Sequence, residues 1–148
     1  VQPTHATSDM YWLYDRVGKK RGKHSYAWAD LYKKSKTIAF GTDFPVEEIN
    51  PIMTFYSAVF RKDVEGFPEE GFQLENSIGR GDALLGMTYY GAHANFEEDE
   101  KGSIESGKLA DFIILDTDLI RDSEYRVKNA KPVATFLDGK LVFSRRFN

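Results

Sequence analysis

The sequence predicts a chain of the α/β class, in which strand and helix segments alternate before a small β module. A short apolar run at residues 38–40 is typical of a buried strand in a parallel sheet. After Pro51, apolar side chains recur at helical spacing, which predicts an amphipathic helix. Near the C-terminus, two strand-like runs flank Asp138 and Gly139, a pair that strongly favours a two-residue hairpin.

The composition is typical of a folded domain, and its basic and acidic residues nearly balance in number. The chain has 148 residues, 41% of them apolar and 14% aromatic, which is enough to bury a core. Its 20 basic and 23 acidic residues give a net charge of −3, so we expect no nucleic-acid partner. The chain contains no cysteine, which excludes disulfides and thiolate metal sites but does not fix the compartment.

The chain also shows no signal for a membrane or for export. No apolar run approaches the roughly 18 residues of a membrane span. The first residues, from Val1 to His5, carry neither a start methionine nor the charged and apolar regions of a signal peptide. We therefore expect a cytoplasmic protein, and we expect the sequence to be a piece excised from a longer one.

The N-terminal third predicts one short strand and two helices. Residues 1–4 favour a strand, with His5 in the loop at its C-terminal end. Helix N-cap residue types at positions 7–9 precede a helix-compatible segment at 10–17. A second helix is predicted at 24–34, where terminal lysines suit the negative end of the helix dipole.

The apolar run at 38–40 ends at Gly41, and a carboxylate, Asp43, follows almost at once, before Pro45, which favours a turn. Two interpretations of Asp43 are open at this point. It could simply cap the turn, as aspartate often does. Alternatively, in a strand–loop–helix barrel, a carboxylate just past the C-terminal end of a strand lies where the chemistry is done.

The rest of the chain predicts two more helices, a long loop and the β module. Asn50 and Pro51 suit the start of a helix, and glycine and proline residues predict a loop over 61–77. A further helix is expected over 81–96, followed by a charged hinge from residue 97. Strands are predicted at 109–116, 132–137 and 140–144. Such a three-stranded piece is marginal alone and requires a partner sheet.

Several of these segments together resemble the amidohydrolase superfamily. Two of them are Gly-Thr-Asp-Phe-Pro-Val at 41–46 with Asn50-Pro51, and Val-Gln-Pro-Thr-His at 1–5. The third is Gly-Ser-Ile-Glu-Ser-Gly-Lys-Leu-Ala-Asp-Phe at 102–112, which resembles the motif at which the chain of these proteins leaves the barrel for the β-sandwich. Their order along the chain is that of the family. The nearest branch is the amidohydrolase 3 group of metal-dependent hydrolases, which includes enzymes similar to N-substituted formamide deformylase.

The resemblance implies both a fold and a site. Residues 1–96 would be the last two βα units of a (β/α)₈ TIM barrel, and residues 97–148 the C-terminal part of a composite β-sandwich. Asp43 matches the aspartate after the eighth strand, which in such enzymes binds the metal and accepts a proton from the attacking water. His5 would face the same mouth of the barrel and contact the small-molecule substrate; it is not an expected metal ligand.

The chain departs from the family pattern in its histidines. It holds only His5, His24 and His93, and none forms the family's paired histidine motif. A catalytic zinc site cannot be assembled from these positions. We therefore expect the C-terminal fragment of a hydrolase that acts on non-peptide carbon–nitrogen bonds. The divalent metal, expected to be zinc, would belong to the longer parent protein, and the chain alone would be inactive.

The open strand edges predict an association. They would be covered by self-association or by the missing N-terminal fragment. The alternative is a truncated, non-catalytic module that binds a partner through these edges.

Overall fold

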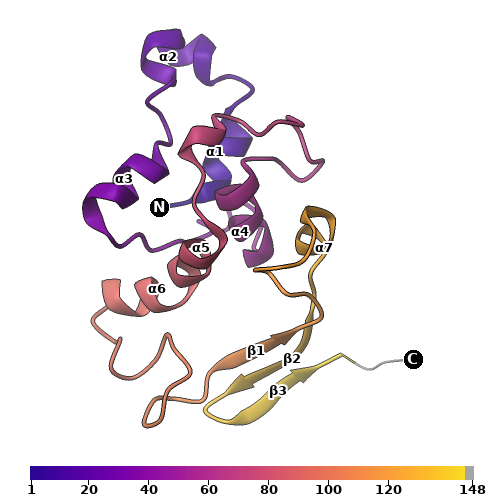
Figure 1. The fold of residues 1–148 in the computed structure, drawn as a ribbon. Helices are drawn as coiled ribbons and strands as arrows, with labels where there is room; N and C mark the ends of the chain where they lie inside the picture. The colour runs from indigo at the N-terminus through magenta and orange to yellow at the C-terminus, as the bar shows by residue number, and fades with distance from the viewer. Residues whose placement is uncertain (146–148) are drawn as a thin grey trace.

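The structure, a computed structural model, describes residues 1–145 of the chain. Helices form one part of the molecule and a small sheet forms the other, with the C-terminal strand at one edge of the sheet (Figure 1). Within the described residues the elements are, in chain order, α1 (Pro3–Asp9), α2 (Leu13–Gly22), α3 (Trp28–Ser35), α4 (Pro51–Phe60), the 3₁₀ helix η1 (Leu74–Asn76), α5 (Arg80–Met87), α6 (Tyr89–Ala94), β1 (Phe112–Leu115), α7 (Glu124–Lys128), β2 (Pro132–Leu137) and β3 (Lys140–Ser144).

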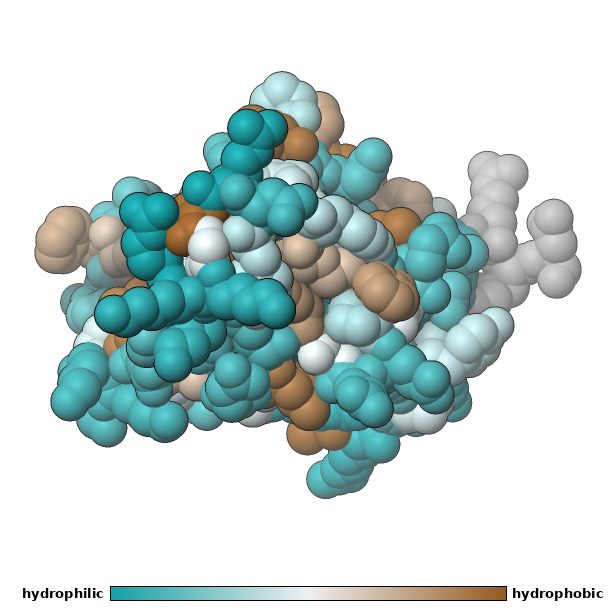
Figure 2. All heavy atoms as spheres, turned by 90° about the horizontal axis from the view of Figure 1, so that it is seen from above, coloured by the Kyte–Doolittle hydropathy of each residue, from teal (hydrophilic) through white to brown (hydrophobic). Residues whose placement is uncertain are grey.

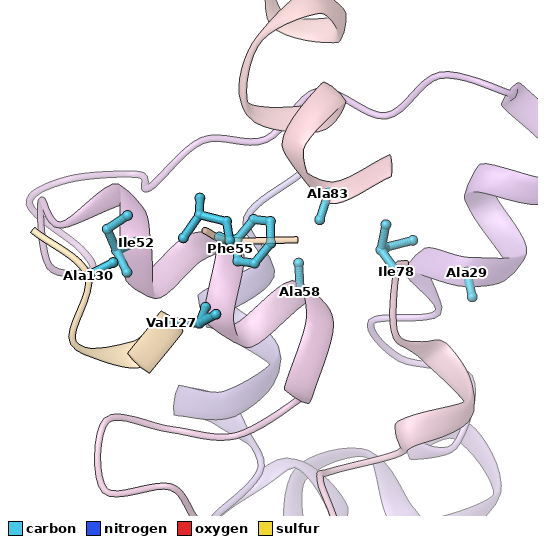
Figure 3. Packing of buried hydrophobic residues seen from close by; sticks show 9 residues of the cluster. Ala29, Ile52, Phe55, Ala58, Ile78, Ala83, Val127 and Ala130 are labelled. Atoms are coloured by element: carbon cyan, nitrogen blue, oxygen red, sulfur yellow. The ribbon is translucent and has the colours of Figure 1, made fainter. Parts of the chain in front are cut away.

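Helix α4 is the centre of the hydrophobic core. It begins as predicted: the Asn50 side chain accepts a hydrogen bond from the backbone N–H of Ile52, and Pro51 is the first helical residue. Phe55 and Ala58 are fully buried, and side chains from α5 and α7 pack around them, while Ala29 of α3 belongs to the same cluster beyond Ile78 (Figure 3). The buried members of this core cluster are Ala29, Ile52, Phe55, Ala58, Ile78, Ala83, Leu119, Val127 and Ala130.

A polar contact fastens α7 to α4 beside this core. The Tyr56 hydroxyl donates a hydrogen bond of 2.7 Å to Glu124, and the ammonium of Lys62 lies 2.9 Å from the same carboxylate. The core therefore takes side chains from both sides of the predicted boundary at residue 96. The division into 1–96 and 97–148 stays a prediction.

The two predicted N-terminal strands are not formed in the described part of the chain. Residues 3–9 form helix α1 instead, because Pro3 suits the first turn of a helix and the preceding Gln2 alone is extended. Residues 38–40 are not assigned as a strand either. They keep only one step of a parallel ladder: the Val1 amino group donates to Ala39 O at 2.7 Å, and Gly41 N donates to Val1 O at 3.0 Å.

The missing ladder has a physical cause. On one edge of residues 38–40 the ladder ends after Val1, because residues 3–9 turn into helix α1. On the other edge the N–H of Phe40 donates to the carbonyl of Gly86 in α5, 2.8 Å away, and not to a strand. The observed architecture is therefore helical with one antiparallel sheet. The TIM-barrel and β-sandwich arrangement is not seen among residues 1–145.

The helix predictions are right in kind and less accurate in their bounds. Helix α3 begins at Trp28, four residues later than predicted, because the chain turns at Tyr26 with φ of 54°. The helix expected over 81–96 is split into α5 and α6 at Thr88, whose backbone is not helical. The short helix α7 was not predicted; its N-cap is Ser123, which accepts from Arg126 N.

The predicted β module is confirmed. The sheet has the order β1-β2-β3 with antiparallel pairs throughout. Asp138 and Gly139 both have positive φ (48° and 71°), the conformation that favours this residue pair in a two-residue hairpin. Phe112 and Phe136 stack across β1 and β2 with ring centroids 4.5 Å apart.

The surface is mixed in character. On the face shown in Figure 2, hydrophilic side chains predominate and apolar ones lie between them in small groups. Every residue of β3 is exposed, including the large apolar Leu141, Val142 and Phe143. No helix built by residues 1–145 is both long and apolar enough to cross a membrane.

Asp116, directly after β1, is expected to make the stability of the β module depend on pH. Hydrogen bonding lowers the pKa of its carboxyl to about 2, first through Lys131 N and then through Arg145 and Thr117. A carboxyl whose pKa is depressed in the folded state stabilises the fold above its ordinary pKa of about 4, and this contribution is lost as the pH falls towards 2.

In urea unfolding at several pH values, Asp116→Asn should be less stable than the wild type at pH 6, and the difference should disappear near pH 2. The exposed Asp99→Asn is the matched control. Equal stability of Asp116→Asn and the wild type at pH 6 would contradict this account.

Candidate active site

Asp43 lies in the segment between α3 and α4 with a half-exposed carboxylate. Its backbone is left-handed (φ 59°), a conformation that aspartate tolerates better than most residues. The turn after it is closed by backbone and threonine atoms: Val46 N donates to Asp43 O at 2.8 Å, and Phe44 N donates to Thr42 Oγ1 at 3.2 Å. Among residues 1–145, the Asp43 carboxylate accepts no hydrogen bond from this turn, so the turn-cap interpretation is wrong.

His5 lies next to Asp43, as predicted, but on a different element. It is in α1 and not in a loop, because Pro3 already starts the helix. Its Nε2 atom is 3.5 Å from Asp43 Oδ2. The same nitrogen is buried and has no partner within hydrogen-bonding distance in the described part of the chain. The two predicted site residues therefore meet, at a separation just beyond that of an ordinary hydrogen bond.

A second carboxylate, Glu47, completes the cluster and was missed by the sequence analysis. Its Oε1 atom lies 3.9 Å from His5 Nε2, and its side chain is only 16% exposed. Ser8 Oγ donates a hydrogen bond of 2.5 Å to the same oxygen. The spacing of His5 and Ser8, three residues apart, would have placed them on one helical face if this segment had been predicted as helix.

The hydroxyl of Tyr26 has a raised pKa, to which nearby carboxylates contribute. Tyr26 donates a short hydrogen bond to Asp9, in the last turn of α1. Burial raises the pKa of the Tyr26 hydroxyl, and the bond to Asp9 and the charges of Asp9 and Glu47 raise it further. Tyr26 is therefore held as a protonated hydrogen-bond donor beside the cluster.

The remaining histidines lie apart from this cluster. His93 is in α6, as predicted, with Nδ1 2.8 Å from Glu98 Oε1. His24 is exposed in the turn after α2 and not in a helix. Across residues 1–145 no group of three histidine or carboxylate side chains has the arrangement of a metal site. This chain alone therefore does not fit a complete catalytic metal centre, which needs at least three protein ligands.

The side chains of His5, Asp43 and Glu47 together can bind a proton and transfer it. The half-exposed Asp43 carboxylate and the Glu47 carboxylate both lie within 4 Å of the same imidazole nitrogen of His5. Carboxylates in such a position serve as general bases when a substrate or water approaches.

Comparison with known proteins gives the class and then the family. Among solved structures, an uncharacterized metal-dependent hydrolase from Pyrococcus horikoshii OT3 superposes with a TM-score of 0.70 at 34% identity, over 84% of this chain and 25% of that one. The fold of this chain is thus similar to part of a metal-dependent hydrolase. The profile of the amidohydrolase family matches residues 1–143, and the chain belongs to this family.

Two relatives cover most of the chain. The protein LONG AFTER FAR-RED 3 of Arabidopsis thaliana is 33% identical over 144 residues, which is 97% of this chain and 24% of that protein. The N-substituted formamide deformylase of Arthrobacter pascens is 29% identical over 108 residues, 73% of this chain and 19% of the enzyme. The chain therefore spans about a quarter or less of the length of these relatives.

Proposed function

We propose that this chain supplies part of the active site of a metal-dependent hydrolase that cleaves non-peptide carbon–nitrogen bonds. The observation that carries the proposal is the Asp43 carboxylate, which is uncommitted to its own turn and faces His5 across 3.5 Å. Membership of the amidohydrolase family supports a hydrolase. The name of the Arthrobacter relative, a formamide deformylase, supports an amide-type bond.

In this proposal Asp43 has two roles. It contributes one oxygen ligand to a divalent metal, for which zinc is the prediction, and it accepts a proton from the attacking water. When bound, such a metal lowers the pKa of a bound water towards about 7, which makes water a nucleophile at neutral pH. His5 contacts the small-molecule substrate. The other ligands come from residues outside this chain.

The proposed arrangement in the longer protein is a barrel with a β-sandwich. The two hydrogen bonds that join Val1 to Ala39 and Gly41 follow the pattern of neighbouring parallel strands, which supports adjacent barrel strands there. The exposed apolar side chains of β3 support a covering partner for the sheet, either a second copy or the rest of the hydrolase. The cytoplasmic location stays a prediction.

The experiment that tests the proposal compares the 148-residue chain with a hydrolase of full family length that carries it. Both polypeptides, loaded with zinc, are assayed on a panel of N-substituted formamides and other small amides. We expect turnover by the longer polypeptide only. Enzyme-like turnover by the 148-residue chain, or none by the longer polypeptide on any carbon–nitrogen substrate, would contradict the proposal. The first outcome would mean that the chain holds a complete site.

A further inference from the structure

We propose that Glu47 and Ser8 are positioning residues that hold the His5 ring against Asp43. This inference rests on the proposed function, because it assigns these residues to the site in which Asp43 acts. Neither residue belongs to the set that the sequence analysis selected.

The first step is the contact between helix α1 and the turn after Asp43. Ser8 lies one helical turn beyond His5, so both side chains leave α1 on the same face. Ser8 Oγ donates to Glu47 Oε1 at 2.5 Å, a length typical of a charge-assisted hydrogen bond to a carboxylate. This bond joins α1 to the turn at residues 43–47, the segment that sets the direction of the Asp43 carboxylate.

The second step concerns the imidazole. His5 Nε2 is buried, with Asp43 Oδ2 at 3.5 Å and Glu47 Oε1 at 3.9 Å. Ionised carboxylates are only acceptors, so a nitrogen that faces two of them has to carry a hydrogen. The geometry therefore assigns the neutral ring to the Nε2–H tautomer, with its N–H edge directed at the two carboxylates.

The other ring nitrogen of His5, Nδ1, then remains for the substrate. A ring fixed in this way has Nδ1 as its remaining nitrogen, and in this tautomer Nδ1 is an acceptor. The substrate contact proposed for His5 would then be made by Nδ1 to a donor on the substrate. This is a specific form of the proposed role, because an N–H group of an amide-type substrate is such a donor.

Glu47 places a second carboxylate oxygen near His5 Nε2, in addition to that of Asp43. The negative charge of a second carboxylate, 3.9 Å from the same nitrogen, adds to the preference for an N–H at that nitrogen over a bare lone pair. Ser8 acts one step further back, because it fixes the Glu47 oxygen that faces the ring. The expected order of effects is therefore Glu47 first and Ser8 second.

The test is the tautomer of His5 in the 148-residue chain, read from long-range ¹H–¹⁵N spectra of the ring at a fixed pH of about 8, above the ordinary histidine pKa of about 6.5. The His5 signals are assigned by their loss in His5→Gln. We expect the wild type to show predominantly Nε2–H. In Glu47→Ala the ratio of Nε2–H to Nδ1–H should fall at least about threefold, which corresponds to about 0.7 kcal/mol at room temperature.

Controls separate positioning from general disturbance. Ser8→Ala should lower the ratio by a smaller factor, and Ser8→Thr, which keeps the hydroxyl, should restore it. Glu48→Ala, an exposed neighbour, should leave the ratio at the wild-type value. Should Glu47→Ala fail to fold, the Ser8→Ala and Ser8→Thr pair decides.

An unchanged ratio in Glu47→Ala, or equal ratios in Ser8→Ala and Ser8→Thr, would overturn the positioning role. This outcome is distinct from failure of the proposed function. The ring spectrum does not depend on hydrolysis, and hydrolysis by the longer polypeptide does not require this tautomer assignment to be right.

Discussion

Asparagine at position 43 is expected to lower kcat of the full-length hydrolase by about a thousandfold or more. Asparagine keeps the size of the side chain but cannot accept a proton, and removing a general base costs roughly 10² to 10⁴ in rate. It is also a weaker metal ligand than a carboxylate. We therefore expect a loss in kcat, measured by steady-state kinetics at saturating metal, and a loss in metal affinity, measured from the dependence of the rate on metal concentration.

The fold should tolerate this substitution. The Asp43 carboxylate is 46% exposed and stabilises none of the turn that follows it, so thermal unfolding of Asp43→Asn should match the wild type. Glu48→Gln, a neutralised carboxylate five residues away on the exposed side, is the matched control and should keep full activity. Full activity of Asp43→Asn would remove Asp43 from its assigned role.

The second large effect is expected on stability, at Arg61. This side chain is fully buried directly after α4. Its Nε donates to Phe72 O at 2.9 Å and its Nη1 to Tyr26 O at 3.3 Å, so one side chain joins the loop at 61–77 to the turn before α3. Burial lowers the pKa of the guanidinium to about 10, with a partial offset from the charge of Glu75.

Arg61→Ala should therefore lower the free energy of unfolding by about 2 to 4 kcal/mol, because two partly buried carbonyl groups lose their donor and a cavity remains where the buried side chain was. Urea unfolding monitored by tryptophan fluorescence would measure this. Arg16→Ala, on the exposed face of α2, should change stability by less than about 0.5 kcal/mol. A change of that small size in Arg61→Ala would show that the buried guanidinium is not needed for the fold.

Local signals predicted the parts of the fold whose stabilising partners are close in sequence. The start of α4 needs only Asn50 and Pro51, and the β2–β3 hairpin needs only Asp138 and Gly139. Each pair determines the backbone through its own dihedral preferences and side-chain hydrogen bonds. These elements were placed correctly from a few residues.

The failures involve segments whose structure depends on distant partners. The apolar run at 38–40 has strand propensity, but a strand requires neighbours, and Phe40 N meets a helix carbonyl of α5 instead. Residues 1–4 were predicted as a strand from the same expectation of a parallel sheet, but helix α1 begins at Pro3. The strand prediction there outweighed a local helix signal, Pro3 followed by small and polar residues.

Only part of the site was predicted from the sequence. Asp43 and His5 were selected through the family motifs, and the structure brings them within 3.5 Å. Glu47 was not selected, because its role depends on a hydrogen bond to Ser8 across a turn and a helix, 39 residues apart in sequence. A contact of that kind has no signature in the spacing of the residues.

The proposed function requires that Asp43 is a metal ligand supplied to a site whose other ligands lie outside this chain. The most direct test is the metal content, by elemental analysis after extensive dialysis, of three samples: the 148-residue chain, the full-length hydrolase, and its Asp43→Asn variant. We predict stoichiometric metal in the full-length hydrolase, a clearly reduced content in Asp43→Asn, and none in the 148-residue chain. Stoichiometric zinc on the 148-residue chain, or an undiminished content in the variant, would contradict the claim.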